Sequence, residues 1–280
     1  MTRVISGVLL AAAALAAIFL LPFVGLRVLA CVVAGLAADE YVRITSAARP
    51  ERTEPFERTH PERRERVDER GFSRWIVIAA VVFSCWWAAV PAPLSIVLLA
   101  IVVIAWLAFA VLRQSRTLND AAVDLVAPIY IGAPLGMLVA LQTLSGPRAT
   151  LVVIATIVVS DTAQYYSGRA FGRRPLAPTI SPKKTVEGAI GGVVCGALFM
   201  AIALTFVFPA TPIVVRLLLG LFVVFLGIAG DLFESRLKRV AGMKDSSALI
   251  PGHGGVLDRI DALLFAIPVF YYMVLQGRVA

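Results

Sequence analysis

Residues 212–239 read PIVVRLLLGLFVVFLGIAGDLFESRLKR, and this stretch combines the two features that decide the fold. Its first part, 212–229, is almost entirely apolar and about as long as a bilayer is thick, which predicts a membrane-spanning helix. Its second part, 230–239, is rich in charge. Within this part four polar side chains follow the i, i+3, i+4, i+7 spacing of a single helical face: Asp231, Glu234, Ser235 and Lys238.

The composition extends this interpretation to the whole chain. Of the 280 residues, 59% are hydrophobic and only 16% are charged, and a mean hydropathy of +0.87 excludes a soluble, disordered or collagenous protein. We therefore predict an all-α, polytopic integral membrane protein with about nine transmembrane helices. Breaks at proline, glycine and charge clusters place these helices at 4–22, 25–43, 74–90, 93–112, 121–142, 149–167, 185–207, 212–229 and 256–277.

We predict one membrane domain over 1–280, because the sequence contains no internal repeat and no low-complexity linker. The N-terminal helices fall within 1–142 and the C-terminal helices within 149–277. The polar segment 45–73 interleaves arginine with glutamate, which is typical of a solvated loop; the alternative is an interfacial segment attracted to anionic headgroups. Three cysteines far apart in apolar runs predict packing residues and neither disulfides nor zinc: Cys31, Cys85 and Cys195.

The basic residues predict the orientation. If the N-terminus is cytoplasmic, nine spans place 22 of the 26 lysines and arginines on the cytoplasmic side. This asymmetry obeys the positive-inside rule, so we predict a multi-pass protein of the cell (inner) membrane with its N-terminus in the cytoplasm and its C-terminus outside. The four basic residues left outside are Arg27, Arg148, Arg216 and Arg278.

The acidic residues of the second half all lie at or near predicted cytoplasmic helix ends. An ion conduit would place charges at the midplane with access from both faces, whereas this pattern predicts a polar chamber open only to the cytoplasm. That favours an enzyme with cytosolic substrates over a transporter. The acids are Asp120, Asp124, Asp161, Glu187, Asp231, Glu234, Asp245, Asp258 and Asp261.

Two further stretches are polar. At the end of the sixth predicted span, Asp161 and Tyr165 are four residues apart and share a helical face; the plainer alternative is a polar helix end at the interface. Before the seventh span, the Ser181-Pro182 pair predicts a helix N-cap and its first residue, and the following lysines would bind phosphate there or merely anchor the helix. Glycines at every fourth position predict close helix packing first and room for a ligand second: Gly188, Gly192 and Gly196.

The third polar stretch continues from 230–239 to the start of the last span. Asp258 and Asp261 lie one helical turn apart there, and with Asp231 they form a set of hard oxygen ligands that favours Mg²⁺ over zinc. The interleaved lysines and arginines suit a phosphate-rich substrate. His253 lies in a glycine-rich turn, where it is either a pocket group or a hydrogen-bonding group of the turn.

Together these stretches resemble the phosphatidate cytidylyltransferase (CDP-diacylglycerol synthase) family. Residues 235–261 match position by position its signature of Ser-x-apolar-Lys-Arg, four residues, Lys-Asp, and His-Gly-Gly-x-x-Asp-Arg-x-Asp. The Ser-Asp-Thr run at 160–162 and the Ser-Pro-Lys-Lys-Thr-x-Glu-Gly run at 181–188 also fit, so the resemblance covers roughly 155–275. The sequence departs from the family at 163–164, where Ala-Gln replaces a bulkier residue or glycine followed by alanine.

The resemblance implies transfer of the cytidylyl group of CTP to phosphatidic acid, giving CDP-diacylglycerol and pyrophosphate in phospholipid biosynthesis, with Mg²⁺ required. Its partners would be CTP, phosphatidic acid and membrane lipids, and we expect no nucleic acid. A second cation such as K⁺ and a homodimer stay open. The resemblance implies that the metal ligands are Asp231, Asp258 and Asp261, with Lys238 and Arg259 as further catalytic residues. The implied substrate-binding residues are Asp161, Tyr165, Ser181, Lys183, Lys184, Thr185, Glu187, Ser235, Arg239, Lys244, Asp245 and His253.

Two other functions remain open. The nearest is a CTP-dependent lipid kinase or a CDP-lipid synthase with a different lipid acceptor, because the metal and phosphate sites would be shared. The second, from a different class, is a transporter, against which the one-sided acids argue.

Overall fold

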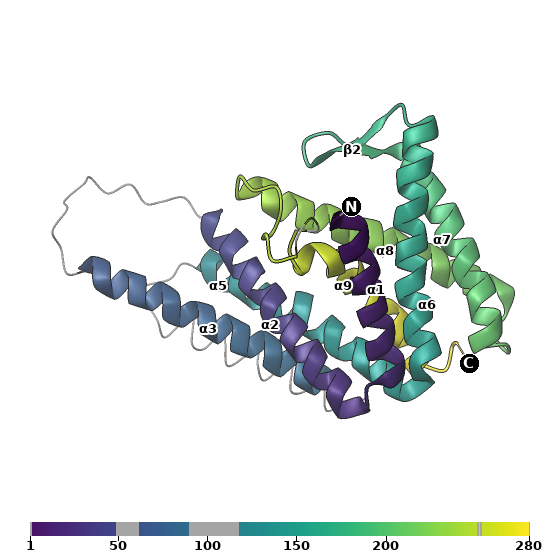
Figure 1. Ribbon diagram of the computed structural model, residues 1–280, viewed down its shortest axis with the longest axis horizontal. Helices are drawn as coiled ribbons and strands as arrows, with labels where there is room; N and C mark the ends of the chain where they lie inside the picture. Colours follow the sequence, from purple (N-terminus) through teal and green to yellow (C-terminus); the bar gives the residue numbers. More distant parts are fainter. Residues whose placement is uncertain (1, 49–61, 90–117, 251, 253, 280) are drawn as a thin grey trace.

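The computed structural model describes residues 2–48, 62–89, 118–250, 252 and 254–279. It is mostly helical, as predicted, with one two-stranded antiparallel hairpin as the exception (Figure 1). The N-terminal elements are α1 (Thr2–Leu20), α2 (Phe23–Ala47), α3 (Glu62–Ala88), α5 (Leu118–Ala127) and the π-helix η1 (Pro128–Gly132). The C-terminal elements are α6 (Ala133–Phe171), β1 (Pro175–Ala177), β2 (Ser181–Thr185), α7 (Val186–Val207), α8 (Ile213–Val240) and α9 (Leu257–Leu275).

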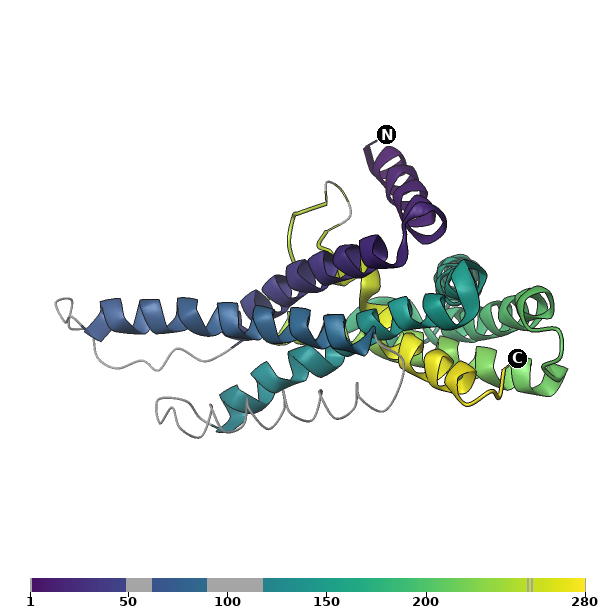
Figure 2. The same ribbon diagram turned by 90° about the horizontal axis from the view of Figure 1, so that it is seen from below.

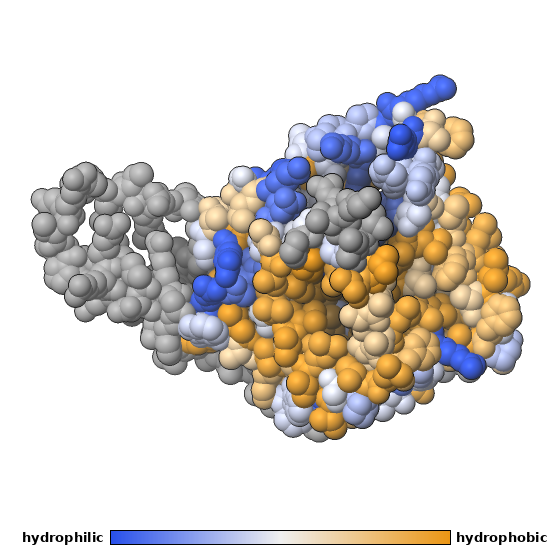
Figure 3. All heavy atoms as spheres, in the orientation of Figure 1, coloured by the Kyte–Doolittle hydropathy of each residue, from blue (hydrophilic) through white to orange (hydrophobic). Residues whose placement is uncertain are grey.

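Three of the described helical stretches are long and apolar enough to cross a membrane: Val123–Phe171, Val186–Val207 and Ile213–Val240. Shorter apolar helices occur at Ser6–Leu20 and Arg74–Ala88. The predicted span 93–112 lies outside the described residues, as do residues 49–61 of the polar segment, so the count of nine spans stays a prediction. Figure 3 shows apolar side chains, in orange, over much of the face of the molecule that is seen in Figure 1. Such an extended apolar surface is typical of a membrane protein.

The predicted gap between the fifth and sixth spans is a kink inside α6. Gly146 has φ 77° and ψ 177°, a backbone conformation that glycine adopts far more readily than other residues. Pro147 follows and has no backbone N–H to continue the ladder of helical hydrogen bonds. The Gly-Pro pair, which is visible in the sequence, therefore ends one predicted span and begins the next.

Several predicted boundaries were wrong. The span expected to end at 229 continues as α8 to Val240, so the charged helical face predicted at 230–239 is part of the same helix. The helix expected to begin at 74 begins at Glu62 as α3, so residues 62–73 of the polar segment are helical and do not form a loop. Ser181 and Pro182 are not the N-cap and first residue of a helix, because they belong to β2. The N-cap of α7 is Thr185, whose Oγ1 accepts a hydrogen bond of 3.1 Å from the backbone N–H of Gly188.

The buried side chains form two hydrophobic cores that α9 joins. The first core lies among α2, α3 and η1 and includes Leu257 and Leu264 of α9. The second lies among α6, α7, α8 and α9 and includes Phe270. Figure 2 shows α2 and α3 side by side, extending away from the bundle of α6 to α9. Helix α9 thus packs in the core of α2, α3 and η1 at its start and in the core of α6, α7 and α8 along the rest of its length.

The glycines of α7 confirm the predicted close packing. A Cβ atom on Gly188 would lie 2.8 Å from the backbone oxygen of Gln164, and one on Gly192 would lie 2.9 Å from that of Ser160. Both contacts are to α6 of the same chain, and Gly196 is equally close to Val224 of α8. The glycine stripe is thus used within one chain and gives no support to a homodimer.

The cysteines agree with the predicted absence of disulfides within the described residues, where all three are free thiols. Cys31 and Cys85 are buried in the first core, as expected of packing residues. Cys195 is exposed on α7, so the prediction that it packs internally was wrong.

Candidate functional site

An ion pair joins the polar stretch at 181–188 to the polar face of α8. Lys184, the fourth residue of β2, pairs its ammonium group with Asp231 on α8. Both side chains are partly buried, and Ser235 Oγ donates to the other oxygen of Asp231 at 3.3 Å. The short hairpin thus carries a lysine onto the polar face of α8, which no local pattern in the sequence revealed.

The Asp231 carboxylate of this pair belongs to a group of three carboxylates from three helices. Asp231 of α8 interacts electrostatically with Asp161 of α6 and with Asp261 of α9. Asp161 also lies within the field of Lys184 and Arg259, and its Oδ1 accepts a hydrogen bond from a side-chain amide of α6 at 3.0 Å. Lys238, which pairs with Glu234 and Asp258, also acts on Asp261. Five acids thus share three basic side chains, which leaves a formal excess of negative charge.

Gly230 explains how two of these acids approach each other. A Cβ atom at this position would lie 2.5 Å from the backbone oxygen of Asp261 and 3.2 Å from the ring of Phe265. Helices α8 and α9 therefore contact each other backbone to backbone beside the carboxylates. Any larger residue at 230 would separate Asp231 from Asp261.

The donor chemistry of this cluster fits a hard divalent cation, because carboxylate oxygens are its preferred ligands and the cluster has excess negative charge. Within the described ranges, no three His, Cys, Asp or Glu side chains form a complete metal-binding group by geometry alone. Lys184 is the cation that meets Asp231 here.

A second, more deeply buried group lies beside this cluster. Glu234 of α8 is fully buried and pairs with Lys238 one turn later. Lys238 Nζ also donates to Asp258 Oδ1 at 2.5 Å, so one ammonium group serves two carboxylates. The other oxygen of Asp258, Oδ2, accepts from Ser246 N (3.1 Å), Ser246 Oγ (2.9 Å) and Gly255 N (2.8 Å). Asp258 is therefore held by the loop on Oδ2, whereas its Oδ1 accepts a hydrogen bond from Lys238.

One member of this group, Glu40, is not among the residues predicted from the sequence. Glu40 of α2 is 3% exposed and accepts four hydrogen bonds from the α8–α9 loop and the start of α9. The donors are Ser246 Oγ (2.9 Å), Ser247 Oγ (2.6 Å), Val256 N (3.0 Å) and Leu257 N (2.8 Å). A signal was present, because a carboxylate inside the predicted span 25–43 is itself a reason to suspect function.

Two predicted substrate-binding residues hold the hairpin. Glu187 accepts hydrogen bonds from the backbone N–H groups of Arg173 (3.0 Å) and Arg174 (3.2 Å) and from Nε of Arg174 (3.1 Å). Arg239 donates from Nε to the backbone oxygen of Ile180 at 3.1 Å and from Nη1 to that of Met243 at 3.2 Å. The hairpin that presents Lys184 is therefore fixed at both ends.

The remaining predicted residues lie around these groups. Tyr165 is exposed, and its hydroxyl accepts a hydrogen bond of 3.4 Å from Arg169. Ser181 is half-buried in β2. His253 lies outside the described residues. Four more are exposed: Lys183, Lys244, Asp245 and Arg259.

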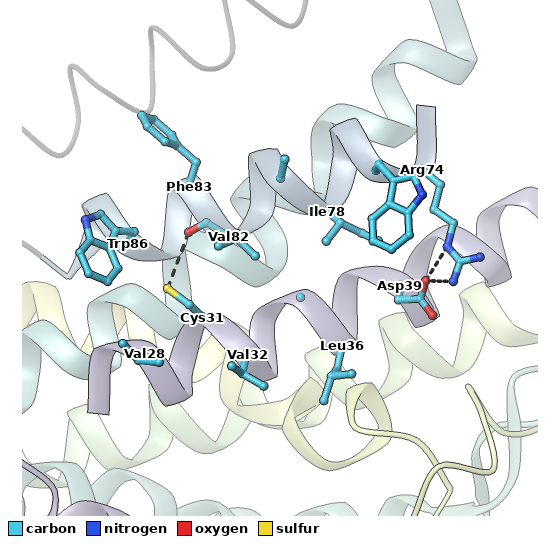
Figure 4. A pocket seen from close by; sticks show the side chains of 13 residues that line it. Val28, Cys31, Val32, Leu36, Asp39, Arg74, Ile78, Val82, Phe83 and Trp86 are labelled. Atoms are coloured by element: carbon cyan, nitrogen blue, oxygen red, sulfur yellow. Dashed lines mark hydrogen bonds and ion pairs between the residues drawn. The ribbon is translucent and has the colours of Figure 1, made fainter. Parts of the chain in front are cut away.

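A cavity of about 910 Å³ lies elsewhere, between α2 and α3 (Figure 4). Its lining is mostly apolar, and an ion pair between Asp39 and Arg74 lies at one end. Figure 4 shows Asp39 on this side of α2 pointing toward Arg74, whereas the neighbouring Glu40 contacts the α8–α9 loop. The cavity is thus separate from the carboxylate cluster.

Comparison with known proteins gives a consistent result. The model of the family described as "Cytidylyltransferase family" matches residues 1–276, so the similarity extends over the N-terminal helices, beyond the range 155–275 that the motifs suggested. The phosphatidate cytidylyltransferase of Aquifex aeolicus is 48% identical over 128 residues, which is 46% of this chain and 48% of that protein. That of Bacillus subtilis is 36% identical over 163 residues, 58% of this chain and 61% of the relative. That of Haemophilus influenzae is 46% identical over 131 residues, 44% of each. The matched regions thus span about half to three fifths of these relatives.

Proposed function

The chain belongs to the cytidylyltransferase family, and from that membership we propose that it transfers the cytidylyl group of CTP to phosphatidic acid. The products are CDP-diacylglycerol and pyrophosphate, in phospholipid biosynthesis. The observation that carries the proposal is the ion pair of Lys184 with Asp231, because it joins a lysine suited to phosphate to a carboxylate on a helix that is long and apolar enough to cross a membrane. The similar proteins are named for this reaction.

In the proposed reaction an oxygen of the phosphatidate phosphate attacks the α-phosphorus of CTP. The new P–O bond forms as the bond to the bridging oxygen of the β-phosphate breaks, and pyrophosphate leaves with that electron pair. Little covalent chemistry is left for the protein, so positioning and charge neutralisation do most of the catalysis. Lys184 and Arg259 supply mobile positive charge beside the acids, and Lys238 holds Asp258 in place.

We assign Mg²⁺ to the cluster of Asp231 and Asp261, with Asp258 contributing through Oδ1. The donor set supports this, because all three are hard oxygen ligands and the group carries excess negative charge. When bound, the ion would share the charge of the phosphates with the basic side chains. Asp161, from α6, would orient the nucleotide or its cation through the same electrostatic field.

The orientation also belongs to this proposal. The start of α1 lies toward the hairpin in Figure 1, and the end of α9 lies toward the opposite side. With the positive-inside rule, this arrangement supports a cytoplasmic N-terminus, an external C-terminus and a polar site that opens to the cytoplasm of an inner-membrane protein. CTP and the lipid headgroup would then reach the carboxylates from the same side.

The test uses purified protein in detergent with phosphatidic acid and CTP labelled on the α-phosphate. We expect label in a chloroform-soluble product, and a loss of about 100-fold or more in Asp231→Asn, because that change removes a metal ligand and the partner of Lys184. Asp39→Asn is the matched control, since Asp39 pairs with Arg43 and Arg74 away from the site.

The label position separates the rival reactions. Label from the α-phosphate enters the lipid only in cytidylyl transfer, whereas label from the γ-phosphate enters it in a kinase reaction. Lipid labelled only by γ-labelled CTP would replace the proposed function with the kinase, and labelling of a different lipid acceptor would change the substrate. Equal turnover by Asp231→Asn would refute the site assignment.

A further inference from the structure

Glu40 is an acidic side chain of the N-terminal helix α2 that contacts the α8–α9 loop, which is part of the third polar stretch. It lies 206 residues before Ser246 in the sequence, yet its carboxylate is almost completely shielded from solvent beside that loop. Burying a carboxylate is costly unless hydrogen bonds replace its water. Four donors do so here, two for each oxygen, and two of them are the backbone N–H groups at the start of α9. The carboxylate therefore acts as a cap for α9 supplied by a distant helix.

The loop is shaped to receive this carboxylate. A Cβ atom on Gly255 would lie 2.0 Å from Ser246 Oγ and 2.4 Å from Glu40 Oε2, so only glycine allows the backbone to approach this closely. Gly254 has φ +79°, and a Cβ atom there would lie 2.6 Å from Asp258 Oδ2. The two adjacent glycines thus make room for two different carboxylates.

Ser246 links those two carboxylates. Its hydroxyl lies 2.9 Å from Glu40 Oε2 and 2.9 Å from Asp258 Oδ2, and its single proton is shared between them. The backbone N–H of Ser246 makes a further bond to Asp258 at 3.1 Å. A displacement of the loop from α2 would therefore turn the Asp258 carboxylate and its Oδ1.

We propose that Glu40 is a positioning residue for the reaction: it holds the α8–α9 loop against α2 and, through Ser246, fixes the orientation of Asp258. The inference rests on the proposed function for its catalytic part and on the hydrogen bonds for its structural part. The N-terminal helices then take part in the site. Glu40 itself has no oxygen left for substrate, because both accept hydrogen bonds from the protein.

The test compares Glu40→Gln with Asp39→Asn, two neighbouring changes that each remove one carboxylate charge from α2. Glutamine keeps the shape but offers one acceptor oxygen, so two of the four donors would face an N–H₂ group. We expect kcat per folded molecule to fall about 10- to 100-fold in Glu40→Gln, as for other residues that orient catalytic ligands. Asp39→Asn should keep the wild-type kcat.

Hydrogen–deuterium exchange supplies a readout that does not depend on turnover. The amides of Val256 and Leu257 should exchange faster in Glu40→Gln, because they lose their acceptor. Ser247→Ala removes one of the four bonds to Glu40, together with the acceptor of the exposed Leu249 N–H. It is a milder variant that should fold if Glu40→Gln does not, and it should show smaller changes at Val256 and Leu257.

Each outcome decides the inference. Slower turnover together with faster exchange at α9 supports it. Wild-type amide exchange at Val256 and Leu257 in Glu40→Gln would overturn the inference that Glu40 holds the α8–α9 loop. Faster exchange with wild-type kcat would overturn its positioning role. A lower unfolding midpoint with unchanged kcat per folded molecule would show a stabilising role only and would likewise overturn it. If the wild type does not label lipid, the proposed function fails, and the exchange data alone decide whether Glu40 holds the loop.

Discussion

The ion pair of Lys238 with Glu234 makes a sharp prediction about stability. Glu234 has no exposed side-chain surface, and the Lys238 side chain is only 11% exposed, so solvent does little to screen the pair. Lys238→Met would leave Glu234 buried with no cation, while its second oxygen, Oε1, already has no hydrogen-bond partner among the described side chains and backbone. Removing one partner of a buried pair costs about 3–5 kcal/mol. We expect Lys238→Met to lower the free energy of unfolding by about that amount.

The assay is unfolding in detergent micelles by titration with SDS, with helicity as the signal. Replacing both partners, in Glu234→Leu/Lys238→Met, removes the isolated charge and should recover most of the stability, because apolar residues of similar size often replace a buried pair without loss. Activity should not recover, because Asp258 still lacks its lysine. The control is Arg74→Met in the more exposed pair with Asp39, which should cost about 1 kcal/mol or less. A Lys238→Met cost no larger than this control, or a double variant as unstable as the single one, would refute the reasoning.

Three further predictions test the loop, the hairpin and the metal. Gly255→Ala should speed amide exchange in the α8–α9 loop and lower turnover, because the new methyl group would clash with Ser246 and Glu40; wild-type exchange would contradict the packing. Thr185→Ala should lower the unfolding free energy by about 1 kcal/mol through loss of the N-cap bond to Gly188, whereas Thr185→Ser should retain it. Removal of divalent cations with EDTA should abolish labelling of lipid and added Mg²⁺ should restore it; turnover that persists in EDTA would contradict the metal assignment.

The polar face of α8 could be predicted because helical spacing is a local property. Asp231 and Lys238 are seven residues apart, so the sequence alone places them on one side of a helix. The span was predicted to end at 229, where the apolar run ends, whereas α8 continues without a break to Val240, for about three more turns. Hydropathy predicts where a helix leaves the membrane and not where its hydrogen bonds stop.

The hairpin and Glu40 were missed for different physical reasons. Strands β1 and β2 have 3 and 5 residues, too few to show an alternating pattern, and the Ser181-Pro182 pair favoured a helix start instead. Glu40 depends on contacts more than 200 residues away, which no spacing rule contains. The available signal was the position of a carboxylate inside the predicted span 25–43, because such a group is costly in a membrane.

The two groups of carboxylates differ in what neutralises them, and this difference indicates where ligands bind. Glu40 and Oδ2 of Asp258 are met by hydroxyl and backbone donors whose positions are fixed by the fold. Asp231, by contrast, is met by the lysine side chain of a hairpin strand, which is 22% exposed and has a flexible stem. A flexible ammonium group can move to a phosphate and leave its carboxylate to a cation, whereas a backbone N–H cannot. Substrate and metal should therefore bind at the cluster around Asp231, and the group around Glu40 should stay unchanged through the reaction as its preorganised support.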